Sequence, residues 1–178
     1  MRTKQFLILA FVMAALSSCM KHASDYKPGY GEIVNTWMFT DGSSQFFGKF
    51  NGNAILHSTP QANNTYLLEM TGMERATGQQ LTLAISLSNP EVTTGTFQSG
   101  VAGSNHETAF YYSGSAASRD PLYASTNNNP GAVMSFVVSH FDATNRTATI
   151  NFSGEAFDMS GNKVNITKGR LTAKVDIQ

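Results

Sequence analysis

The sequence predicts an all-β domain, and three observations lead to this prediction. Apolar and polar residues alternate with a period of two along most of the chain after residue 33, as in strands with one buried face. Charged residues make up only 13% of the chain, and Gly, Ser, Thr and Asn are abundant, which disfavours long amphipathic helices. Turn-forming segments separate the alternating runs. We expect an antiparallel two-layer β-sandwich of about 9 to 11 strands, with a closed calycin-like β-barrel as the alternative.

The first 18 residues have the features of a lipoprotein signal peptide. Arg2 and Lys4 form a charged start, and the apolar run at 6–16 is too short to span a bilayer. Two serines then precede Cys19, the single cysteine of the chain. The sequence Leu-Ser-Ser-Cys resembles the lipobox of bacterial lipoproteins. This resemblance implies cleavage before Cys19, thioether lipidation of that residue, and firm membrane anchoring by two or three acyl chains.

The mature chain divides into a short tether and one domain. Residues 19–32 begin with the lipidated cysteine, lack periodicity and contain one proline and two glycines, so we interpret them as flexible. Residues 33–178 have the size of a single domain. Loss of Arg2 and Lys4 leaves ten basic residues against twelve acidic ones, a formal charge of −2. This charge does not favour nucleic acid as a partner.

In the first half of the domain, short alternating runs predict strands. The clearest is 81–87, where leucine or isoleucine occupies every odd position, and 66–70 alternates in the same way. A polar segment at 74–78 lies between these runs and predicts a hairpin loop. Trp37 lies on an apolar alternation and is expected to anchor the core.

Two further segments are rich in turn-forming residues. Asn51 and Gly52 lie between the apolar runs 46–50 and 54–56, which is a strong signal for a hairpin that pairs those runs. The segment 114–130 is long, polar and contains many residues typical of turns. Loops of this length are usually functional or disordered, so we predict a loop here.

The C-terminal third predicts a three-stranded meander. Residues 131–141 are apolar on both faces, which favours a central strand covered on both sides, with His140 at the edge of the core. Polar turns at 142–145 and 158–162 separate this run from two further strands.

The apolar phase flips within the last of these strands. Apolar residues occupy even positions up to Ile166 and odd positions from Leu171 onward. A one-residue β-bulge at Gly169 would reconcile the two halves, and we favour it over two strands joined by a tight turn.

The C-terminal pattern resembles the ending of small lipoproteins common in the Bacteroidetes. The segments that carry this resemblance are 131–138, 140–145, 148–157 and 160–169. Proteins of this kind also combine a lipobox with an Asn-Gly hairpin and a Gly-Thr turn, here Gly95-Thr96-Phe97. The resemblance supports the fold and a location at the cell envelope, on the outer membrane, and leaves open the periplasmic face or the cell surface. It has no assigned activity and transfers no catalytic residue.

No residue pattern points to catalysis or metal binding. The four histidines have no partner at the spacing of a zinc site; they are His22, His57, His106 and His140. A G-x-S-x-G elbow and a glycine-rich phosphate loop are both absent, and no two acidic residues are distinguished as a general acid and base. We therefore predict no catalytic residue, no metal and no cofactor.

Aromatic residues are the most suggestive candidates for ligand binding. Tyr111 and Tyr112 belong to a run of three aromatics, and Tyr123 lies in the polar segment near Asn127. Tyrosines beside amides can stack on and hydrogen-bond a sugar or a peptide, so these four residues are candidate binding residues. The alternative, which we favour, is that Tyr111 packs inward while Tyr112 and Tyr123 cap the sheet edge.

These observations predict a lipid-anchored protein of the cell envelope that is not an enzyme. We expect a binding or assembly module attached to the membrane through Cys19, whose partner is a glycan, a peptide or another envelope protein. Two alternatives stay open. The first is an envelope hydrolase acting on glycan or peptide through residues that only the fold brings together, and the second is a carrier of a small apolar ligand.

Overall fold

A computed structural model describes residues 35–49, 52–61, 64–73, 77–104, 107–115 and 120–178. All of them belong to one unit, Ile33–Gln178. The predicted signal peptide, Cys19 and the tether lie outside the described residues. The described part of the chain holds no helix long and apolar enough to cross a membrane.

The described residues form eleven strands and no α-helix, which confirms the all-β prediction. The strands are β1 (Thr36–Thr40), β2 (Gln45–Lys49), β3 (Ala54–Leu56), β4 (Tyr66–Met73), β5 (Gln80–Leu87), β6 (Gly95–Ser99), β7 (Ala109–Ser113), β8 (Tyr123–Thr126), β9 (Met134–Asp142), β10 (Thr147–Asp158) and β11 (Lys163–Ile177). The predicted loop at 114–130 thus contains one strand, β8, whose partners lie on β7 and β10.

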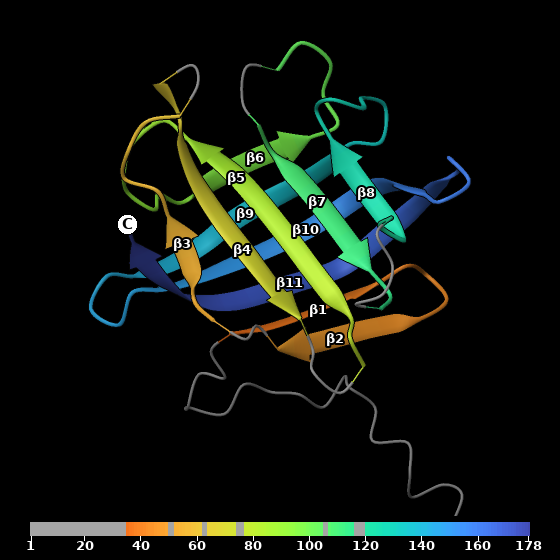
Figure 1. The fold of residues 1–178 in the computed structure, drawn as a ribbon, viewed down its shortest axis with the longest axis horizontal. Helices are drawn as coiled ribbons and strands as arrows, with labels where there is room; N and C mark the ends of the chain where they lie inside the picture. Colours follow the sequence, from red (N-terminus) through yellow and green to blue (C-terminus); the bar gives the residue numbers. More distant parts are fainter. Residues whose placement is uncertain (1–34, 50–51, 62–63, 74–76, 105–106, 116–119) are drawn as a thin grey trace, which may run out of the picture. The chain divides into compact units, whose positions relative to one another are not determined.

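The strands lie in two layers (Figure 1). Strands β3, β4, β5, β7 and β8 form the front layer, and β2, β1, β11, β10, β9 and β6 form the back layer. The layers join at two corners, where β3 pairs with β11 and β8 pairs with β10, so the pairings close a ring of seven strands. The β3–β11 pair is parallel and the other pairs are antiparallel. The sheet is therefore mixed. The β3–β11 pair can be parallel because the two strands are far apart in sequence and no short turn fixes their relative direction.

The core between the layers is dominated by aromatic rings. Phe39 is fully buried, and its ring lies 4.8 to 6.5 Å from six other aromatic rings, measured between centroids. Trp37 is buried beside it, as predicted. The odd positions of β5 also face inward, so the faces of the strands predicted at 66–70 and 81–87 are confirmed.

The predicted bulge in the last strand is confirmed. Phe152 of β10 pairs with Gly169 of β11, and Gly154 pairs with Ile166. Two positions on β10 thus correspond to three positions on β11, which places one extra residue on β11. The left-handed residue of the bulge is Lys168, with φ of 54°, and not the neighbouring glycine. Gly169 is required for another reason, because a β-carbon there would overlap the Phe152 ring and backbone.

The predicted hairpin at Asn51-Gly52 is wrong, although Asn51 itself lies outside the described residues. Strand β2 pairs with β1, while β3 pairs with β4 and β11. The turn that forms the hairpin instead is capped by Asp41, whose Oδ1 accepts hydrogen bonds from the N–H groups of Ser43 and Ser44 at 2.9 and 2.7 Å. This local cap outweighs the Asn-Gly signal.

The predicted meander β9-β10-β11 is confirmed, but two details of β9 are corrected. The strand is not covered on both sides, because Val137 on its outer face is 39% exposed, and Val133, directly before the strand, is 37% exposed. His140 is exposed and does not lie at the core edge. The cause is an extra residue, Ser139, which shifts the register against β10 and reverses the direction of His140.

Candidate ligand-binding groove

The four tyrosine and asparagine candidates do not form one surface. Tyr111 points outward from β7 and is 38% exposed, whereas Tyr112 has no exposed surface, which reverses the inward Tyr111 that we favoured. The cause is the phase of β7, which directs Phe110 and Tyr112 into the core. Tyr123 is also buried, with its ring 6.0 Å from that of Tyr112. Asn127 accepts a hydrogen bond from the backbone N–H of Val101 at 3.1 Å.

Tyr123 has a structural contact that the sequence did not indicate. Its hydroxyl donates a hydrogen bond of 2.6 Å to Oδ2 of Asp41, which ties β8 to the β1–β2 turn. Partial burial alone would raise the pKa of Asp41, but hydrogen bonds from Tyr123, Ser44 and Ser43 outweigh burial and lower this pKa from 3.8 to about 2. Burial and the Asp41 charge raise the pKa of Tyr112 to about 12, so its hydroxyl stays neutral.

We expect Tyr123→Phe to lower the free energy of unfolding by about 1.5–3 kcal/mol at neutral pH, because a hydrogen bond to a charged group is lost. The pKa of Asp41 is lower in the folded chain than its ordinary 3.8, so its contribution is complete above pH 3.8 and is lost as the pH falls through about 2. The deficit of the variant should therefore shrink over that range in urea titrations. Tyr111→Phe makes the same chemical change at an exposed ring and should shift stability by less than about 0.5 kcal/mol. A deficit independent of pH would contradict the role of the Asp41 charge.

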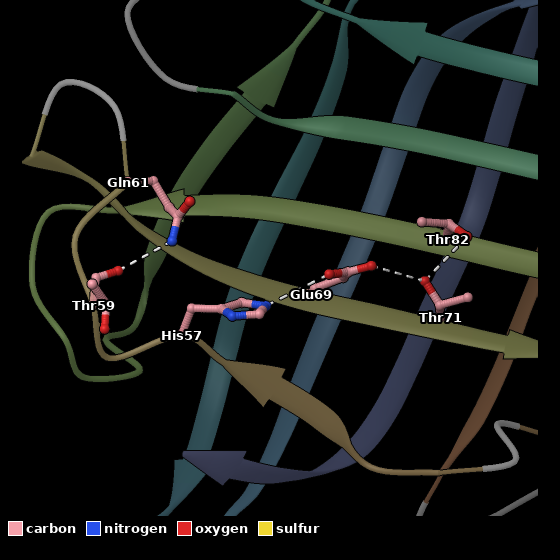
Figure 2. A network of polar contacts seen from close by, with 6 residues as sticks. All are labelled: His57, Thr59, Gln61, Glu69, Thr71 and Thr82. Atoms are coloured by element: carbon pink, nitrogen blue, oxygen red, sulfur yellow. Dashed lines mark hydrogen bonds and ion pairs between the residues drawn. The ribbon is translucent and has the colours of Figure 1, made fainter. Parts of the chain in front are cut away.

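A polar network lies on the outer face of the front layer (Figure 2). His57 Nε2 is 3.6 Å from Glu69 Oε2, and Thr71 Oγ1 lies 3.4 Å from Glu69 Oε1 and 3.3 Å from Thr82 Oγ1. Tyr111 lies opposite Thr82 in the β5–β7 register. The distances among His57, Glu69, Thr71 and Thr82 are long for hydrogen bonds, so the network lacks the tight geometry of a preorganised site. Its exposed ion pair also contributes little to stability.

A groove of about 390 Å³ lies on the outer face of the back layer, beside the β11 bulge. Nine residues of β1, β9, β10 and β11 line it: Met38, Ser135, Val137, Asn151, Phe152, Ser153, Lys168, Gly169 and Arg170. They combine two cations, three neutral hydrogen-bonding side chains and apolar walls. This is the mixture of apolar surface and a few placed polar groups that ligand sites usually have.

The two cations of the groove are unpaired with respect to the described carboxylates. The ion pairs among the described residues are His57 with Glu69 and Lys163 with Glu155, and neither involves Lys168 or Arg170. Both of these groove cations are exposed. The groove therefore offers two positive charges in a chain whose formal net charge is zero.

Lys168 has a backbone conformation that residues other than glycine disfavour. Its φ of 54° lies in the left-handed region, which costs a non-glycine residue about 1–2 kcal/mol. Glycine would relieve this cost, yet the chain places its glycine one residue later, where Phe152 requires it. Strain of this kind is often found at functional sites, which makes the charge of Lys168 a candidate for function.

Sequence reasoning missed the groove because its residues come from four strands whose pairing partners are distant in the chain. One signal was available. The phase flip at 167–170 coincides with two cations on either side of Gly169, and bulges commonly re-aim side chains at functional sites.

No family model, curated protein or solved structure matches this chain. What the groove can bind therefore follows from its own residues, and their chemistry favours an anionic ligand that also bears hydroxyl groups and apolar surface.

Proposed function

We propose that this protein is a lipid-anchored, non-catalytic binding module of the cell envelope, and that its ligand carries negative charge and binds in the groove. The observation that carries the proposal is the pair of exposed cations, Lys168 and Arg170, which line one concave surface and have no described carboxylate as a partner. A guanidinium binds carboxylate or phosphate oxygens through two parallel hydrogen bonds, and a lysine beside it adds a second positive charge.

The location rests on the sequence. The Leu-Ser-Ser-Cys motif after an apolar run of signal-peptide length supports lipidation of Cys19 and attachment to the outer membrane. The tether at 19–32 would leave the domain free to meet a ligand at a distance from the bilayer surface.

Binding is favoured over hydrolysis by the residues that line the groove. They include neither a carboxylate nor a histidine, the groups that most often transfer protons in hydrolytic enzymes. The groove is also an open surface feature, while the space between the layers holds the aromatic core, so a surface ligand is favoured over an enclosed apolar one.

The test compares the full lipidated chain with the double variant Lys168→Gly, Arg170→Gln in titrations against inorganic polyphosphate and polyglutamate at low salt. We expect both anionic chains to bind, and the double variant to bind at least about tenfold more weakly. Added salt should weaken binding because the charges are exposed. Lys174→Gln removes an exposed cation from the same strand outside the groove and serves as the matched control.

The single variant Lys168→Gly tests whether binding is lost without a loss of folding. Relief of the left-handed strain and the added freedom of glycine in the unfolded chain nearly cancel, so this variant should be as stable as the natural chain or more stable by up to about 1 kcal/mol. Equal binding by the natural chain and the double variant, or equal losses in the double variant and Lys174→Gln, would overturn the proposal.

A further inference from the structure

We infer that the anionic ligand is an acidic polysaccharide that lies across the strands of the back layer, perpendicular to them. This inference rests on the proposed binding function and names the ligand class of the same groove. It is carried by one row of outward-facing side chains that crosses the layer through the groove.

The row follows directly from the strand register. The pairs join Phe47 to Met38, Met38 to Arg170, and Arg170 to Asn151, and they continue from Asn151 to Val137 and from Val137 to Thr96. All six strands of the back layer thus contribute one residue each: Phe47, Met38, Arg170, Asn151, Val137 and Thr96. Neighbouring strands lie about 4.8 Å apart, which is about the length of one sugar ring, so the row spans about 24 Å.

The chemistry along the row suits a sugar chain with acidic groups. Phe47 lies at one end and is 68% exposed, so its ring is available to stack on the apolar face of a sugar. Arg170 can hold a carboxylate through two hydrogen bonds, and Lys168 lies beside it in the groove. Met38 and Val137 supply apolar contacts between the polar positions.

Asn151 is fixed in a position to bind a hydroxyl group. Its Nδ2 donates a hydrogen bond of 3.0 Å to Oγ of Ser139, and that hydroxyl donates to the backbone oxygen of Thr149 at 3.2 Å. Ser139 is the extra residue that shifts the β9 register, so the irregularity of β9 holds this side chain. The side-chain oxygen of Asn151 keeps its capacity to accept a hydrogen bond from a sugar hydroxyl.

Other anionic partners fit this surface less well. The groove is concave and partly apolar, whereas the phosphates of a bilayer form a broad plane that a protruding cationic surface would meet better. An extended acidic peptide pairs most readily with a sheet edge through its backbone, and the row lies on a sheet face whose strands β1, β9, β10 and β11 are already paired on both sides.

The experiment measures the affinity of the full lipidated chain for oligogalacturonate long enough to span the row. The methyl ester of the same oligomer keeps the sugar chain and removes its charge. Polyphosphate, polyglutamate and glycerophosphoglycerol, the water-soluble headgroup of phosphatidylglycerol, represent the other anionic sources. We expect oligogalacturonate to bind at least about tenfold more tightly than its ester and than each of the other anions, because only it meets both the cations and the stacking and hydroxyl positions.

Two surface variants test the row itself. Phe47→Ala and Asn151→Ala should each weaken oligogalacturonate binding by about tenfold and leave polyphosphate binding unchanged, because polyphosphate has neither an apolar face for Phe47 nor sugar hydroxyl groups for Asn151. Met159→Ala is the matched control for Phe47→Ala, since Met159 is 66% exposed and belongs neither to the row nor to the groove lining.

The outcomes separate this inference from the proposed function. Oligogalacturonate binding no tighter than polyphosphate or polyglutamate, with no effect of Phe47→Ala, would overturn the polysaccharide and leave an anion-binding groove. Tighter binding to glycerophosphoglycerol or to polyglutamate would assign the groove to a lipid headgroup or an acidic protein segment instead. If no anionic probe bound, both the inference and the proposed function would fail.

Discussion

Replacement of Phe39 by alanine should lower the free energy of unfolding by about 3–5 kcal/mol, the range for loss of a fully buried phenylalanine. Its ring has no exposed surface and contacts six aromatic rings drawn from both layers. The cavity left behind would be lined by rigid rings that collapse poorly, which favours the upper part of this range. Urea unfolding followed by Trp37 fluorescence and by circular dichroism measures the effect.

Phe47→Ala provides the comparison for this prediction. It removes the same ring from the neighbouring strand of the same layer, at a position that is exposed. Its effect on stability should stay within about 0.5 kcal/mol. A loss below about 1 kcal/mol in Phe39→Ala would mean that the neighbouring rings refill the space, and the aromatic cluster would then not be the main source of packing energy.

Replacement of Gly100 by alanine should cost about 2–4 kcal/mol. Gly100 has φ of 73°, and a β-carbon there would overlap the backbone oxygen of Ala132. That oxygen accepts a hydrogen bond from the buried hydroxyl of Ser125 at 2.6 Å, and the oxygen of Gly100 accepts one from Gly131 N–H at 2.9 Å. The cost combines left-handed strain of about 1–2 kcal/mol with damage to buried hydrogen bonds of similar size.

Gly103→Ala separates these two contributions. Gly103 has a similar φ of 71°, but nothing lies within 4 Å of the position of its β-carbon. It should therefore show only the left-handed cost of about 1–2 kcal/mol in thermal unfolding. Equal losses in the two variants would show that the segment around Ala132 moves aside freely, which would contradict the expected overlap.

The strands and their buried faces could be predicted from the sequence because alternation is a local property. Leu81 and Leu83 face inward because of their own neighbours along the chain, whatever strand pairs with β5. Pairing partners are not local. The Asn-Gly signal at 51–52 reflects only the local sequence of a turn. The hairpin forms instead at the turn capped by Asp41, where β2 pairs with β1.

The exposed Val137 of β9 shows a second limit. Val137 and Val138 are equally apolar. Only the register and the layers reveal that Val138 faces the core while Val137 lines the outer groove. The residues that line the groove were missed for a related reason. Arg170 and Asn151 lie opposite each other on paired strands. The Ser139 irregularity that holds Asn151 changes the apolar phase between Val138 and Phe141, but the apolar Val137 obscures that change in the sequence.

The parallel pairing of β3 with β11 has a consequence for how the chain reaches its native state. Strand β11 pairs with β1 and β3, more than a hundred residues earlier in the chain, as well as with its neighbour β10. A chain that emerges from synthesis with its N-terminus first therefore exposes β1 and β3 long before their common partner exists. Non-local pairing of this kind folds slowly, and the waiting strand edges are open to pairing with other chains. The chain avoids such mispairing only if these edges stay apart until β11 arrives, so its folding depends on timing as much as on stability.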